Sequence, residues 1–81
     1  MEDFLNEIDK VISGEFTSTK SNMLISPINV ANYLEDIGFV KEDFDSNGWD
    51  WDFWATYVRG EERFQLTSNG CYKKGLIFSR I

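Results

Sequence analysis

Histidine is absent from this 81-residue chain, and cysteine and proline each occur once. Without histidine, the chain cannot carry a Ser-His-Asp or Cys-His catalytic site, a histidine-ligated zinc site or an imidazole pH switch. The single Cys71 excludes a disulfide within the chain and a cysteine-rich metal site, and it favours a reducing, intracellular environment. We therefore expect a non-enzymatic protein that uses no cofactor.

Long apolar runs are also missing, because no uninterrupted apolar stretch exceeds three residues, as in Met23–Ile25 and Leu76–Phe78. A helix that spans a bilayer needs ~20 apolar residues. Met1 is followed by two acids, which is the wrong sign for the start of a signal peptide. A basic amphipathic stretch that would bind an anionic membrane surface is missing as well. These absences predict a cytoplasmic protein with no membrane partner.

The chain is long enough for a single small domain over residues 1–81, and its 42% hydrophobic content argues against disorder. Helical spacing of apolar residues predicts a helix over residues 2–13. A second helix is expected over about residues 27–37, because Ser26 and Pro27 are typical of a helix start and Gly38 of a helix end. The polar segment 15–22 between them is predicted to be a linker.

Alternation of period two begins at Trp49 and predicts strands in the second half of the chain. One face of the first strand is expected to pack on the two helices; it consists of Trp49, Trp51, Phe53, Ala55 and Tyr57. A second strand is expected over residues 64–67, followed by a hairpin at Asn69-Gly70 and a returning strand with a bulge at Gly75. The predicted fold class is therefore α+β, with two N-terminal helices on a three-stranded antiparallel meander in the order α-α-β-β-β.

Charge is distributed unevenly along the sequence. The net charge is −6, with −9 in residues 1–52 and +3 in residues 53–81. Seven carboxylates lie within eighteen residues, and a single base, Lys41, lies among them. These acids are Glu35, Asp36, Glu42, Asp43, Asp45, Asp50 and Asp52.

The acidic cluster has two interpretations. Surface acids commonly serve only to keep a small domain soluble. Closely spaced acids also repel one another, and a rigid array of them can imitate a phosphate backbone or attract a basic partner surface. Trp54 lies on the strand face opposite the predicted core, where it could anchor such a contact. The candidate partner-binding residues are therefore Glu35, Asp36, Glu42, Asp43, Asp45, Asp50, Asp52 and Trp54.

Calcium and nucleic acid are alternatives to a protein partner. Residues 43–48 match the start of a calcium loop, but Trp54 stands where that loop needs a glutamate, so a polar turn before a strand is the favoured interpretation. The basic residues of the C-terminal half could bind nucleic acid next to the aromatic strand, but the overall negative charge argues against it.

Three segments carry a resemblance to a group of known proteins. Residues 47–54 (NGWDWDFW), residues 32–39 (NYLEDIGF) and residues 75–79 (GLIFS) together resemble small uncharacterised proteins of bacteriophages and prophages, over roughly residues 27–80. The resemblance implies a small acidic inhibitor that binds a host protein, because proteins of this kind block restriction enzymes, CRISPR effectors or other defence components, sometimes by imitating DNA.

The resulting hypothesis is a phage-type inhibitor that acts in the host cytosol. It would bind a basic surface of a host defence or nucleic-acid-handling protein through its acidic and aromatic residues, with no direct contact to nucleic acid. The alternative is a structural or regulatory module that self-associates, for instance as a homodimer, through an exposed sheet face or an unpaired edge strand.

Overall fold

Two helices and five strands form the described part of the chain in the computed structural model, which describes residues 2–21, 25–46, 53–68 and 75–81. In chain order the elements are α1 (Glu2–Ile12), β1 (Ser18–Lys20), α2 (Pro27–Asp36), β2 (Val40–Ser46), β3 (Phe53–Arg59), β4 (Glu62–Ser68) and β5 (Leu76–Arg80). The α+β class is confirmed, while the three-stranded meander is wrong because the sheet has five described strands.

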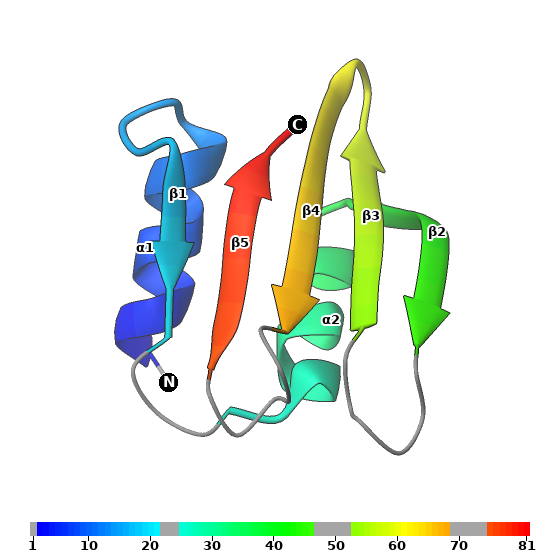
Figure 1. Cartoon of the computed structure of the whole chain (residues 1–81). Coiled ribbons are helices and arrows are strands. Elements are labelled where there is room, and N and C mark those ends of the chain that lie inside the picture. Colours follow the sequence, from blue (N-terminus) through cyan, green and yellow to red (C-terminus); the bar gives the residue numbers. More distant parts are fainter. Residues whose placement is uncertain (1, 22–24, 47–52, 69–74) are drawn as a thin grey trace.

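The five strands form one antiparallel sheet in the order β1-β5-β4-β3-β2. Strands β2 to β5 follow one another as a meander, and β1 pairs with β5 at the far edge. Both helices lie behind this sheet in Figure 1, with α1 near β1 and α2 behind the β3–β4 side. The molecule therefore has two layers, and one face of the sheet is left without a covering helix by the described elements.

The helices form where the sequence predicts them. Phe4, Ile8 and Val11 of α1 are buried, as the helical spacing of apolar residues requires. Helix α2 begins with Pro27 at its first position and buries Val30 and Leu34 against the sheet. Its first turn contains no acid, and Ser26 at the N-cap makes no side-chain capping hydrogen bond.

Arginines of the sheet cap the C-terminal ends of both helices. Arg80 Nη2 donates a hydrogen bond to the carbonyl oxygen of Ile12 at 2.8 Å, and Arg59 Nη1 donates one to that of Ile37 at 3.0 Å. These cations meet the negative ends of the two helix dipoles. Glu62 lies within 3.5 Å of Arg59 and 3.7 Å of Arg80, so one carboxylate is shared by both arginines.

The hydrophobic core lies between the helices and one face of the sheet. Ring contacts join its aromatic residues: Phe64 stacks on Phe78 at 5.3 Å between centroids and meets the edge of Phe39 at 5.4 Å. Ala55 and Tyr57 of β3 are buried in this core, which confirms that this face of β3 points toward the helices. Trp49, Trp51 and the Phe53 side chain lie outside the described residues.

Three sequence predictions need correction. The segment 15–22 was expected to be a linker but contains β1, whose three residues pair with Ile77 to Ser79 of β5. The segment 40–46 forms β2, for which no strand was predicted. Gly75 does not form a bulge; it precedes β5 with a positive φ of 101°, at a place where the backbone of Ser21 leaves no room for a Cβ atom. The predicted Asn69-Gly70 hairpin lies outside the described residues.

Candidate functional site

The candidate residues come from separate elements of the fold. Glu35 and Asp36 are exposed at the C-terminal end of α2, in the helix layer. Glu42 and Asp43 are exposed on β2, at the edge of the sheet. The structure therefore divides the described acids between two elements. Asp45 belongs to β2 by its backbone pairing, and Asp50 and Asp52 lie outside the described residues.

The sheet face that the described helices leave uncovered brings Trp54 close to the acidic strand. Trp54 of β3 is half-buried and pairs with Asp45 on one side and with Thr67 on the other. Paired residues on neighbouring strands share a face, and alternation places Trp54 opposite Ala55 and the core. We call this surface the open face; its β2–β4 part consists of Val40, Val58, Arg63, Asp43, Thr56, Gln65, Trp54 and Thr67.

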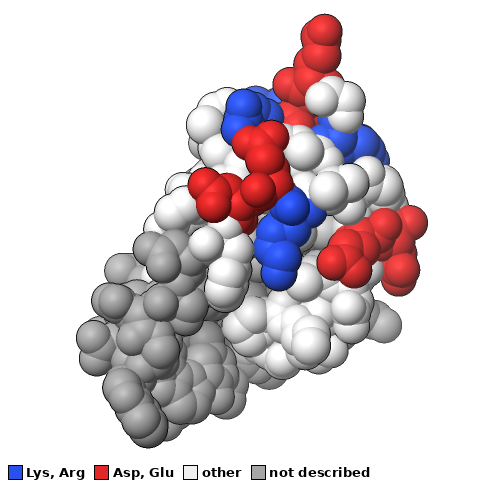
Figure 2. Space-filling model, turned by 90° about the vertical axis from the view of Figure 1, so that its right-hand side faces the viewer, with Lys and Arg blue, Asp and Glu red and all other residues white. Residues whose placement is uncertain are grey.

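Ion pairs neutralise part of the charge on this side of the molecule. Arg63 of β4 forms a salt bridge with Glu42 of β2, reaching across β3. Figure 2 shows acidic and basic side chains alternating over the described surface on the β2 side, with no continuous acidic area there. The arginines that could have served nucleic acid, Arg59, Arg63 and Arg80, all pair with carboxylates in this structure.

Strand β2 carries two features that discourage another strand from adding to its edge. Its pairing with β3 shifts between Lys41 and Asp43, so Glu42 forms a β-bulge. The backbone N–H of Phe44 donates to Asp43 Oδ1 at 2.9 Å, which occupies one of the edge amides. Bulges and charged residues are common means of protecting edge strands from aggregation.

The calcium-loop interpretation is not supported by the local structure. Residues 43–46 belong to β2 and pair with residues 53–56 of β3, so they are extended where a calcium loop would have to wrap its ligands around an ion. Within the described residues, no group of three or more potential ligands of the His, Cys, Asp and Glu types could hold a metal ion.

Two tyrosines have perturbed ionisation. The pKa of Tyr33 is raised to about 12, first by burial and then by the hydrogen bond that its hydroxyl donates to Asp9 Oδ1 at 2.5 Å and by the charge of Asp9. Burial also raises the pKa of Tyr57, with a smaller contribution from the negative charge of Glu35. Both hydroxyls are therefore protonated at neutral pH and are able to donate a hydrogen bond.

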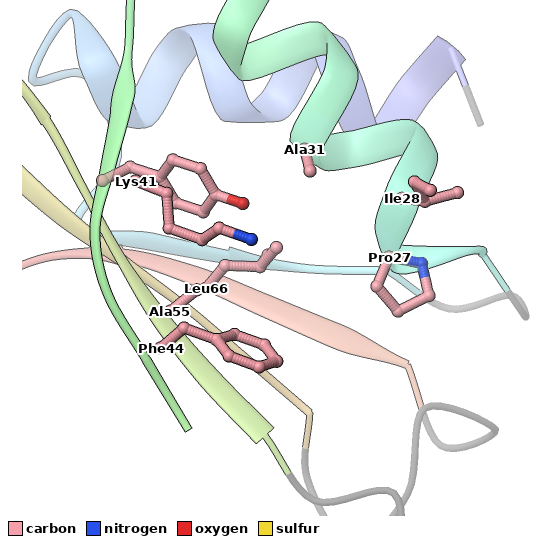
Figure 3. Close-up of a pocket in the computed structure, with 8 residues that line it drawn as sticks. Pro27, Ile28, Ala31, Lys41, Phe44, Ala55 and Leu66 are labelled. Atoms are coloured by element: carbon pink, nitrogen blue, oxygen red, sulfur yellow. The ribbon is translucent and has the colours of Figure 1, made fainter. Parts of the chain in front are cut away.

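An apolar groove that sequence reasoning missed lies on the other side of β2, between this strand and α2. It has a volume of about 180 Å³, and its walls include Pro27, Ile28 and Ala31 of α2 and Phe44 of β2. Figure 3 shows the Lys41 side chain extending from β2 into the space between the two elements. Ile28 and Phe44 are 65% and 53% exposed, an unusual degree for large apolar residues that flank a core.

The groove could not be found from apolar periodicity because a bulge creates it. Lys41 and Phe44 are three residues apart, and a regular strand would place them on opposite faces. The bulge at Glu42 returns both to the helix side, where they pair with Tyr57 and Ala55 respectively. No period-two pattern in the sequence predicts this arrangement.

Comparison with known proteins gives no match: no protein-family model, no curated protein and no solved structure is similar to this chain. None of the described helices is long and apolar enough to cross a membrane.

Proposed function

We propose that this protein is a non-enzymatic binding protein that docks the β2–β3 part of its open face on a basic surface of a partner protein. The observation that supports the proposal most is the position of half-buried Trp54, on the open face that the described helices leave uncovered and paired in register with Asp45 of the acidic edge strand. Tryptophan is enriched among interface residues that contribute ~2 kcal/mol or more to binding. Acids around such an anchor direct it toward a cationic surface.

The resemblance to small phage proteins extends the proposal to a class of partner. In that case the partner is a host defence or nucleic-acid-handling protein, and binding inhibits it. The division of the described acids between α2 and β2 favours a compact contact centred on Trp54 over an extended imitation of DNA. Glu35 and Asp36 then lie outside the contact, while Asp43 and Asp45 belong to it.

A matched pair of double variants tests this assignment. We expect tagged wild-type protein to retain a partner from bacterial lysate at low salt and to release it at high salt, as a charge-dependent contact requires. D43K/D45K should lose this partner, and E35K/D36K should keep it, although both variants change the net charge equally. Circular dichroism of each variant establishes that it is folded.

The same samples distinguish the alternative of self-association. Light scattering that shows a stable dimer, dissociated by Trp54→Ala, would replace the proposal with a self-associating module. Equal retention of the partner by folded wild type and D43K/D45K would contradict the proposed surface.

A further inference from the structure

The α2–β2 groove contains a buried polar group that the described protein leaves without a hydrogen bond. Tyr57 lines the groove and is only 2% exposed. Its hydroxyl stays protonated at neutral pH, yet it makes no hydrogen bond to any of the described residues. A buried hydroxyl without a partner is costly and uncommon, so its presence in an apolar groove points to an acceptor that is supplied from outside.

A positive charge lines the same groove. Lys41 extends into the groove, and its Nζ atom lies 4.9 Å from the centroid of the Phe44 ring. Lys41 forms no ion pair with any of the described residues. The first turn of α2, which provides Pro27 and Ile28 to the groove, carries no acid to offset its N-terminal dipole. The polar groups that line the groove therefore suit an anionic oxygen.

The volume of the groove limits the size of the apolar group that a ligand can place in it. A volume of about 180 Å³ is smaller than the ~300–1,000 Å³ of pockets that enclose drug-sized molecules. It is comparable to an engineered cavity of ~150 Å³ that holds one benzene ring. One aromatic or branched side chain would fill it, and exposed Ile28 and Phe44 offer further apolar contact to neighbouring residues of the same ligand.

We propose that the groove binds the C-terminal end of a partner polypeptide. The last side chain, aromatic or branched, enters between α2 and β2. Its terminal carboxylate accepts a hydrogen bond from the Tyr57 hydroxyl and forms an ion pair with Lys41. Capture of a terminal carboxylate next to a side-chain pocket is an established mode of peptide recognition. Simple strand addition is disfavoured, because the bulge at Glu42 and the Asp43 contact to the Phe44 amide interrupt the edge.

Nuclear magnetic resonance titration of the full chain with two defined probe pairs tests the proposal. The first pair is N-acetyl-phenylalanine and its amide. The second is a pool of hexapeptides with random sequence that end in Phe, prepared with a free carboxyl group or as the amide. We expect the free-acid peptides to shift amide signals around the groove and to bind at least about tenfold more tightly than the amides, which lack the charge.

Two groove variants and one control variant separate binding from folding. Lys41→Gln should weaken the free-acid peptides about tenfold and leave the amides unchanged, whereas Lys20→Gln, on the opposite edge strand, should have no effect. Tyr57→Phe should also weaken the free acids. It should leave the thermal midpoint unchanged or raise it, because it removes a buried hydroxyl that has no hydrogen-bond partner among the described residues.

Each remaining outcome overturns the proposal. Equal affinity for acids and amides would show that the groove recognises no carboxylate. N-acetyl-phenylalanine binding as tightly as the hexapeptides would make it a small-molecule site. Signal shifts confined to the open face, or no shifts up to millimolar peptide, would exclude the groove as a peptide site.

Discussion

The close approach of Gly75 to Ser21 predicts an unusually large effect for the smallest possible substitution. Gly75 has a φ of 101°, and a Cβ atom added there would lie 2.4 Å from the backbone oxygen of Ser21 and 3.1 Å from its Oγ. Real Cβ atoms do not approach a backbone oxygen this closely, so Gly75→Ala must displace one of the two segments.

The displaced contact joins β1 to the rest of the sheet. The Ser21 N–H donates to the Leu76 carbonyl oxygen at 2.9 Å, and Ser21 Oγ accepts from the Leu76 N–H at 2.8 Å. Positive φ costs an alanine ~1–2 kcal/mol, and the loss or distortion of these two hydrogen bonds adds ~1–3 kcal/mol. We expect Gly75→Ala to lower the free energy of unfolding by about 2–5 kcal/mol, against a total of roughly 4–12 kcal/mol for a domain of this size.

Gly14 provides a matched control. Its φ is 90°, but a Cβ atom there would meet nothing within 4 Å, so Gly14→Ala isolates the cost of backbone conformation at ~1–2 kcal/mol. Urea denaturation monitored by tryptophan fluorescence measures both variants. If Gly75→Ala costs no more than Gly14→Ala, then β1 does not pack against the start of β5 as described, and the reasoning from the close approach is refuted.

Two further variants test the helix contacts. The pKa of Tyr33 is raised from its ordinary value of 10 to about 12 in the folded protein, so its contribution to stability is complete below pH 10 and is lost as the pH rises through 12. Tyr33→Phe should therefore flatten the decline of the urea midpoint between these pH values, and an unchanged decline would contradict the Asp9 contact. Arg80→Gln removes the cation at the C-terminal end of α1 and should cost ~1 kcal/mol at low salt and less at high salt, whereas a salt-independent loss would indicate packing alone.

Elements with a one-sided apolar pattern could be predicted from the sequence. Both helices bury a stripe of apolar residues and end close to glycines, and β4 alternates between buried and half-buried positions from Phe64 to Ser68. In these elements the secondary structure that the local sequence favours is also the one that buries its apolar residues in the core.

Strand β1 lacks such a pattern for a physical reason. It is three residues long and polar, and it turns only Thr19 toward the helices, where the Thr19 hydroxyl donates to Glu7 Oε2 at 2.5 Å. Its place in the sheet depends on backbone pairing with β5, which leaves no trace in apolar periodicity. The Ser-Thr-rich composition that favoured a linker is equally suitable for a short edge strand.

The candidate site was predictable in part. Alternation placed Trp54 on the face opposite the core, and the register confirms this position. The acids were grouped by their proximity in the sequence, but α2 ends before β2 begins, so Glu35 and Asp36 belong to the helix layer while Glu42 and Asp43 belong to the sheet. Sequence proximity therefore grouped acids that belong to two separate elements, because it does not show where the helix ends and the strand begins.

The bulge at Glu42 links the two proposed surfaces. Val40 and Asp43 both face the open side of the sheet, and Lys41 and Phe44 both face α2, although the two residues of each pair are three positions apart in the sequence. Without the extra residue, one member of each pair would change sides. The position of Asp43 on the open face and that of Lys41 in the groove therefore both depend on the bulge at Glu42. The same bulge also protects the edge of β2 from pairing with further strands. The bulge at Glu42 therefore determines which side chains of β2 face each of the two proposed surfaces.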